Sequence, residues 1–166
     1  GVDARQGTLE QVALEEGAYD VAVFQHSLEH VVDPVADLRR VRTALRDGGL
    51  VLVSVPHFGS WQRRRFRDRW YHLDLPRHRV HFTRAALADA LSAAGLRPVH
   101  LSTSTSAVGL PATVQYAVFG RCLFPDGLWL RVASGLCALA LPISRLADRL
   151  GRDGDVLHAV AVRRDA

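Results

Sequence analysis

The chain has 166 residues, 48% hydrophobic and 23% charged, so it is long enough to bury one globular core and predicts a single domain. Its net charge of +4 comes from 21 basic residues, all Arg. This balance permits weak attraction to nucleic acid or anionic lipid, and it is also typical of high-GC codon usage. Cys122 and Cys137 are too few for a disulfide framework or a zinc site, so neither is predicted and a reducing cytoplasm is the expected location.

The first part of the chain alternates apolar runs with helical patterns. Asp33 before Pro34 is typical of a helix start, and Gly48-Gly49 ends the connection to the next strand. The predicted elements are a strand over 2–6, a short helix over 9–15, a strand over 20–25, a helix over 34–46 and a strand over 49–55. The last three form a βαβ unit of an open parallel sheet, whose functional residues lie at the strand ends.

The second part begins with a polar, aromatic and basic segment from His57 to His81. Thr83 is then the expected N-cap of a helix over 83–94 that Gly95 closes. A strand over 97–104, helices over 111–123 and 126–149 and a closing strand over 155–163 complete the prediction.

The order of several short motifs carries a family resemblance. Asp20 starts a strand, Leu28-Glu29-His30-Val31 follows it, and Asp47-Gly48-Gly49 precedes an apolar strand that ends in Pro56. This part resembles the second half of a class I S-adenosylmethionine-dependent methyltransferase, in the branch of the ubiquinone-biosynthesis O-methyltransferases. The resemblance covers roughly residues 1–105. It continues through Trp70, residues 73–78 and His81-Phe82-Thr83, and residues 154–157 resemble the family's last strand, which pairs antiparallel to its neighbour.

The resemblance implies an α/β fold, a Rossmann-like methyltransferase sheet with a helical hairpin inserted before the last strand. The single partial domain 1–166 would divide into a core over 1–105, the helical insertion over 106–153, and the last strand and tail over 154–166. The family's Gly-x-Gly-x-Gly cofactor loop is absent from the 13 glycines, and the chain has no Met. We therefore expect an N-terminally truncated domain whose first two strands lie upstream.

The implied cofactor is S-adenosyl-L-methionine. By resemblance, Thr8, Leu9 and Glu10 form the adenine-side loop, while Gln25, His26 and Leu28 lie beside the methionine part. The alternative for Gly7-Thr8 is a plain strand-to-helix turn with Thr8 as a cap.

The candidate catalytic residues are His26, Glu29 and His30. An imidazole with a pKa near ~6.5 can accept a proton from an acceptor hydroxyl at neutral pH, and the alternative is that His26 only packs and bonds to backbone. Some relatives, including small-RNA 2′-O-methyltransferases, hold a divalent ion with Glu-x-x-Glu-His and a distant His. In this chain His26 replaces the first glutamate of that motif, and His78 and His81 are the downstream histidines. Losing one carboxylate disfavours Mg²⁺, so the metal alternative is Zn²⁺ or Mn²⁺. The prediction is no metal, with Glu29 capping or orienting the turn.

The segment from His57 to His81 corresponds to the family's cover over the acceptor pocket. The substrate-binding candidates are Trp70, His72, Arg77, His78 and His81, and the alternative is that Trp70 only packs the loop down. The expected partner is a small-molecule acceptor that is lipid-like, quinone-like or a sugar, and nucleic acid is disfavoured.

Residues 127–147 are strongly apolar, but Arg131 interrupts them and Pro142 follows, so a membrane span of ~20 residues is not predicted. A helical hairpin that packs on the sheet edge or caps the acceptor pocket is favoured. Peripheral membrane contact through 127–147, flanked by Arg121, Arg145 and Arg149, is the alternative, so the expected location is cytoplasmic with membrane association left open.

The predicted function is S-adenosylmethionine-dependent methyl transfer to a small molecule, with O-methylation favoured and little activity expected from these 166 residues alone. Two alternatives remain. One is a non-catalytic Rossmann-like binding or scaffold domain without the cofactor loop. The other is a nucleotide-binding oxidoreductase, which would need a dinucleotide fingerprint that this sequence lacks.

Overall fold

The computed structural model describes residues 4–120, 128–151 and 153–164, and within its longest helix it describes the side chains of residues 139 and 141–151. The elements in chain order are β1 (Tyr19–Gln25), η1 (Leu28–His30), α1 (Pro34–Ala44), β2 (Leu45–Pro56), α2 (Trp61–Phe66), η2 (Arg67–Arg69), η3 (Tyr71–Leu73), α3 (Arg84–Ala93), β3 (Leu96–Ser104), α4 (Gly109–Phe119), α5 (Leu128–Gly151) and β4 (Val156–Arg163).

The four strands form one mixed sheet in the order β1-β2-β4-β3. β1 and β2 run parallel, with Phe24 opposite Val53, as a βαβ unit requires. β4 lies antiparallel between β2 and β3, so the predicted direction of the closing strand is confirmed.

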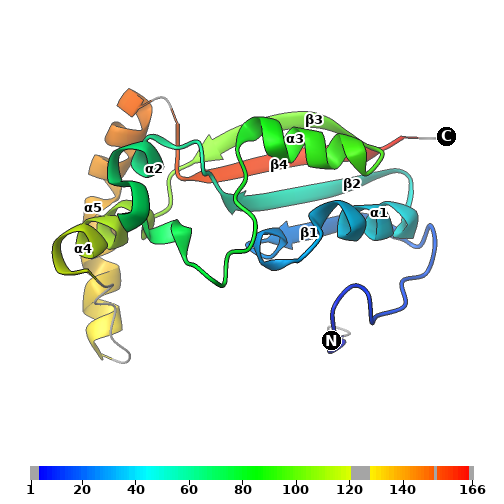
Figure 1. The fold of residues 1–166 in the computed structure, drawn as a ribbon, viewed down its shortest axis with the longest axis horizontal. Coiled ribbons are helices and arrows are strands. Elements are labelled where there is room, and N and C mark those ends of the chain that lie inside the picture. The colour runs from blue at the N-terminus through cyan, green and yellow to red at the C-terminus, as the bar shows by residue number, and fades with distance from the viewer. Residues whose placement is uncertain (1–3, 121–127, 152, 165–166) are drawn as a thin grey trace.

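Helices α1 and α3 pack side by side on one face of the sheet (Figure 1). Asp33 Oδ1 accepts a hydrogen bond from Ala36 N at 3.0 Å, and Thr83 Oγ1 accepts one from Ala86 N at 3.2 Å, so both predicted N-caps are confirmed. The core lies between these helices and the sheet and contains Leu38, Val41, Leu87 and Leu91 from the helices with Val51, Val53, Val55, Leu157, Ala159 and Ala161 from the strands.

The other face of the sheet is less covered. Val21 and Val23 are 44% and 61% exposed, and Leu52 and Val160, which pair across β2 and β4, are half-buried. β1 is an edge strand and pairs only with β2 among the described residues, and β3 forms the opposite edge.

Helices α2, α4 and α5 gather at the end of the molecule toward which β1 and β2 run (Figure 1). The two helices predicted between β3 and the last strand are therefore present, although the parts of those predictions at residues 121–123 and 126–127 lie outside the described residues. In the described part of the chain, no helix is both long and apolar enough to cross a bilayer.

Two predicted elements at the start of the chain are wrong in their described part. Residues 4–6 form no strand, and the outer edge of β1 has no paired strand among the described residues. Residues 9–15 form a single turn, in which Gln11 N and Val12 N donate to Thr8 O at 3.0 and 3.1 Å. One hydrogen-bonded turn is too short to overcome the cost of helix nucleation. Residues 2 and 3 of the predicted strand lie outside the described residues.

Candidate functional site

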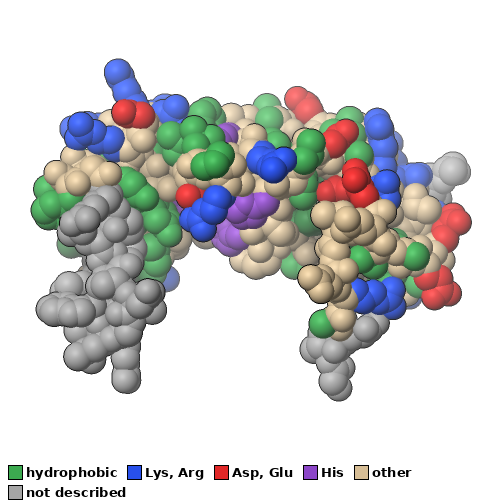
Figure 2. Space-filling model, turned by 60° about the horizontal axis from the view of Figure 1, so that its bottom comes forward, with side chains coloured by type: hydrophobic (Ala, Val, Ile, Leu, Met, Phe, Trp, Pro, Cys, Tyr) green, Lys and Arg blue, Asp and Glu red, His purple; other side chains and the backbone are tan. Residues whose placement is uncertain are grey.

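A cleft rich in imidazole side chains lies at the carboxyl end of β1. Figure 2 shows a patch of histidine side chains near the middle of one face of the molecule. The cavity measures about 240 Å³ and is lined by His26, Glu29, His30, Tyr71, His72, Asp74 and His78. The first three follow β1 and the others belong to η3 and the turn after it, so two distant segments of the chain build this site.

Backbone hydrogen bonds join these two segments. Arg79 N and Val80 N both donate to Glu29 O, at 2.8 and 3.1 Å. His30 Nδ1 lies 3.0 Å from Arg77 O, and because a carbonyl oxygen only accepts, Nδ1 carries the proton. Nε2 of His30 is therefore the nitrogen with a free lone pair when the ring is neutral.

Glu29 is the deepest charged residue of the site. It is 1% exposed, and neither of its carboxylate oxygens has a hydrogen-bond partner among the described residues. Its Oε1 lies 3.4 Å from His26 Nδ1 and 3.9 Å from His78 Nε2. Because an uncompensated buried charge is costly, the His26 imidazole, which can offer a proton to Oε1, is the group that compensates this carboxylate.

His26 is positioned by an unusual backbone conformation. Its φ of 49° is in the left-handed region, which non-glycine residues seldom adopt, while its N–H donates to Ser54 O at 2.9 Å. The side chain is 40% exposed, so it is open to solvent on one side and faces Glu29 on the other. The Glu29 carboxylate raises the pKa of His26 above its ordinary value, against the opposing effect of partial burial.

His78 is held as a neutral acceptor. Its Nδ1 donates to His72 O at 2.8 Å, so Nε2 points toward Glu29 and toward Asp74 Oδ2 at 3.7 Å. Burial lowers the pKa of His78 below its ordinary value. The neutral ring then presents the Nε2 lone pair to the cleft.

Glu29, His30 and His78 are the described residues that could hold a metal ion, because each offers one ligand atom and these atoms lie within 4.8 Å of one another. One carboxylate oxygen and two imidazole nitrogens suit Zn²⁺ or Mn²⁺ better than Mg²⁺. This set differs from the metal alternative considered for the sequence, since His26 and His81 are not part of it.

A second carboxylate supports the far wall of the cleft. His72 Nε2 lies 3.1 Å from Asp155 Oδ2, and Asp155 is fully buried. The same carboxylate accepts hydrogen bonds from Ser106 N at 2.7 Å and Ser106 Oγ at 2.6 Å. His72 is therefore fixed in orientation by the residue that precedes β4.

Several sequence candidates lie outside the cleft lining. Trp70 is 2% exposed and packs against Phe58 and His72, so it holds the loop down rather than facing an acceptor. His81 Nε2 lies 3.0 Å from Leu73 O, where it braces η3. Arg77 is exposed and pairs with Asp74, and this carboxylate raises the pKa of Arg77.

The cofactor candidates form no single group in the structure. Thr8 and Glu10 are exposed, and Gln25 is exposed at the end of β1. The prediction that Leu28 lines the crevice is wrong for its side chain, which is fully buried in the core because η1 turns it inward.

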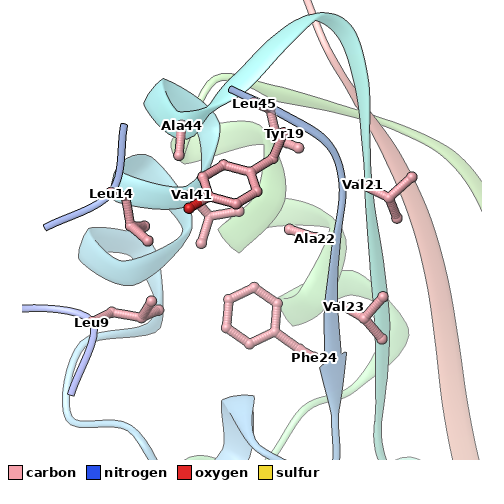
Figure 3. Close-up of a pocket in the computed structure, with 10 residues that line it drawn as sticks. All are labelled: Leu9, Leu14, Tyr19, Val21, Ala22, Val23, Phe24, Val41, Ala44 and Leu45. Atoms are coloured by element: carbon pink, nitrogen blue, oxygen red, sulfur yellow. The ribbon is translucent and has the colours of Figure 1, made fainter. Parts of the chain in front are cut away.

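Leu9 lines a second cavity, an apolar one of about 230 Å³ between α1 and β1. Figure 3 shows Leu9 and Leu14 facing the rings of Phe24 and Tyr19 across it, while Val21 and Val23 point away. Leu9 lines this cavity together with Phe24, which directly precedes Gln25 at the end of β1. Leu9 therefore lies near the end of β1 but is not part of the histidine cleft.

The sequence reasoning missed Tyr71, Asp74 and Asp155. Asp74 has a left-handed φ of 36° inside the Leu-Asp-Leu-Pro-Arg-His motif that carried the resemblance, so the motif was the signal for it. Asp155 lies in residues 154–157, which resemble the family's last strand, but its pairing with His72 had no signal because only the fold brings the start of β4 beside His72.

The comparisons with known proteins agree on one family. A family model described as "Methyltransferase domain" matches residues 2–101. The ubiquinone biosynthesis O-methyltransferase of Marinobacter nauticus is 41% identical over 56 residues, which are 32% of this chain and 24% of that enzyme.

Solved structures share the fold. A SAM-dependent methyltransferase of Thermotoga maritima superposes with a TM-score of 0.59 at 16% identity, over 99% of this chain and 65% of that one. The 1,6-didemethyltoxoflavin-N1-methyltransferase of Burkholderia thailandensis, solved with S-adenosylhomocysteine, gives 0.50 at 18% identity, over 95% of this chain and 48% of that one. This chain therefore spans about half to two thirds of the length of these neighbours. Since the family model matches more than half of the residues and the α/β sheet is that of Rossmann-like methyltransferases, the chain belongs to the methyltransferase-domain family.

Proposed function

We propose that this chain forms the acceptor side of an S-adenosylmethionine-dependent methyltransferase that methylates a hydroxyl group of a small molecule. The observation that carries the proposal is the His26–Glu29 pair at the carboxyl end of β1, where ligands of open α/β sheets bind. A raised pKa together with an open side gives His26 the properties of a general base.

The arrangement defines the proton's route. Because Nδ1 faces Glu29, it carries the proton of neutral His26, and Nε2 is free to take the acceptor's hydroxyl proton. The acceptor oxygen then attacks the methyl carbon in line with the sulfonium, the carbon–sulfur bond breaks, and S-adenosylhomocysteine leaves as a neutral thioether. Glu29 acts as a positioning residue that stabilises the imidazolium formed.

The donor's site is proposed at the same strand end. Gln25 and His26 would contact its methionine part, the backbone of Leu28 follows, and Thr8, Leu9 and Glu10 approach from the α1 side. The solved neighbour with S-adenosylhomocysteine supports this choice of donor. The 166 residues contain no Gly-x-Gly-x-Gly loop, so we expect them to bind the donor weakly on their own.

The acceptor is proposed to be a phenol of the quinone-like class, with lipid-like molecules and sugars as further choices. Support comes from the name of the Marinobacter nauticus relative and from the cleft, whose Tyr71, His72 and His78 rings offer flat surfaces beside polar nitrogens. His72, fixed by Asp155, and Arg77 at the rim would orient the acceptor.

The test is transfer of a labelled methyl group from S-adenosylmethionine at millimolar concentration to a panel of phenols, catechols and sugars. His26→Ala is expected to lower turnover roughly 10²-fold, the contribution of a positioned base, while KM for the donor changes little. His100→Ala is the matched control, because His100 is an exposed histidine on β3 outside the cleft.

Each other outcome decides against part of the proposal. Wild-type turnover that His26→Ala leaves intact would remove the base. Failure to bind the donor even at millimolar concentration would favour the alternative of a non-catalytic binding domain. Activity that a chelator abolishes and Zn²⁺ or Mn²⁺ restores would make metal binding the role of Glu29, His30 and His78, whereas the proposal predicts no effect of chelation.

A further inference from the structure

In the part of helix α5 whose side chains the structure describes, residues 139 and 141–151, some polar side chains are buried and several aliphatic ones are exposed. Its described buried side chains include Ser144 and Asp148, which are 0% and 4% exposed. Asp148 Oδ1 accepts hydrogen bonds from Trp61 Nε1 and Gln62 Nε2 of α2. The face of α5 that packs on the protein is therefore partly polar.

The outward face of the described part of α5 is aliphatic. Leu139, Ile143, Leu146 and Leu150 are 77%, 68%, 57% and 77% exposed. Their spacing of four, three and four residues puts them in one stripe along the helix, on the side opposite Ser144 and Asp148. Exposed aliphatic side chains aligned over three turns mark an interaction surface rather than scattered surface residues.

The exposed charged side chains in the described part of α5 are both arginines, and on their inner side they line a polar groove that also contains Asp148 and Asp153. Arg145 and Arg149 lie one turn apart along the flank of the aliphatic stripe and are exposed. The single acid of α5, Asp148, is buried in its contacts with α2, and α4 carries no charged residue. A second copy of the helix would bring arginine toward arginine, whereas a layer of anionic headgroups would complement both.

Helix α4 adds apolar surface at the same end of the molecule (Figure 1). Val114 and Val118, one turn apart, are 44% and 66% exposed, and Phe119 beside them is 59% exposed. α4 also contacts the wall of the cleft, because Tyr71 N donates to Thr113 Oγ1 at 3.2 Å. The end that carries the stripe is thus adjacent to the proposed acceptor site.

We propose that the outward face of α5, formed by Leu139, Ile143, Leu146 and Leu150 with Arg145 and Arg149 beside them, docks onto the surface of an anionic lipid bilayer. The helix lies in the interface, its aliphatic stripe enters the acyl boundary, and the two guanidinium groups bind lipid phosphates. The docking is independent of the methyl-transfer proposal, although it would bring the cleft near a lipid-soluble acceptor.

The test is sedimentation of the protein with vesicles of phosphatidylcholine mixed with phosphatidylglycerol and with vesicles of phosphatidylcholine alone. We expect binding to the anionic vesicles that weakens as salt rises, and little binding to the neutral ones. Combining Ile143→Ser with Leu146→Ser should weaken binding about tenfold or more, because both side chains leave the acyl boundary. Arg145→Gln and Arg149→Gln should each weaken binding roughly fivefold and reduce the salt dependence.

Val32→Ser is the matched control, since Val32 is 79% exposed and lies beside α1, away from α5. An unchanged melting temperature for the serine variants separates lost docking from lost folding. Equal binding of wild type and the Ile143→Ser, Leu146→Ser variant would overturn the proposal, as would absence of vesicle binding. A dimer in solution that the same two substitutions dissociate would instead assign the stripe to a second copy of the chain.

Discussion

Glu29 is the residue that ties the cleft together. Its backbone oxygen accepts from Arg79 N and Val80 N, and its buried carboxylate faces His26 and His78. The two imidazoles respond in opposite directions, since the pKa of His26 is raised by Glu29 and the pKa of His78 is lowered by burial. The side-chain contact with Glu29 at His26 and the burial of His78 thus separate a histidine that gains a proton readily from one that stays neutral, a pattern common in sites that move a proton.

Glu29→Gln is predicted to lower the pKa of His26 toward ~6.5, because the amide keeps the size of the side chain and removes its charge. The measurement is the pH titration of the His26 ring by NMR. Methyl transfer needs neutral His26, so activity should rise with pH through the raised pKa, and the variant should show the same rise at lower pH.

The control is Glu15→Gln, which removes an exposed acid outside the cleft.

The raised pKa of His26 also makes the stability of the fold depend on pH. A histidine whose pKa is raised on folding stabilises the fold below the unfolded value of ~6.5, and this stabilisation is lost as pH rises through the folded-state pKa. A His26 pKa that Glu29→Gln leaves unchanged would contradict the pairing.

At the scale of elements, the caps were predictable because they depend on residues close in sequence. Asp33 with Pro34 and Thr83 determined where α1 and α3 begin, and the structure confirms both side-chain hydrogen bonds. The predicted strand 2–6 was wrong in its described part because a strand exists only through its partner, which no local pattern supplies.

Asp33→Ala is predicted to lower the free energy of unfolding by about 1 kcal/mol, because Ala36 N loses its acceptor at the start of α1. Urea denaturation measures the loss. Ser27→Ala is the control, since Ser27 precedes η1 but makes no side-chain cap hydrogen bond, and its effect should be small. Equal losses for both variants would show that capping is not what stabilises α1.

At the scale of the whole molecule, sequence motifs indicated one wall of the cleft and the fold supplied the other. The end of β1 at Gln25 is followed within five residues by His26, Glu29 and His30, so their proximity to β1 was predictable. The contacts of His72 with Asp155 and of Glu29 with His78 join segments far apart in the chain, and only tertiary packing reveals them. Likewise, Trp70 and Leu28 were assigned to ligands because of their motifs, and burial places both in packing roles.

We propose that the methyl donor binds at the carboxyl end of β1 beside His26. Titration of the isotopically labelled chain with S-adenosylhomocysteine to millimolar concentration, followed by amide NMR shifts, tests it even when binding is weak. We expect the shifts to concentrate at residues 8–10 and 25–28 and to reach the His26 ring. Shifts elsewhere, such as in the polar groove around Thr103 and Arg149, or no shifts in these two segments, would contradict it.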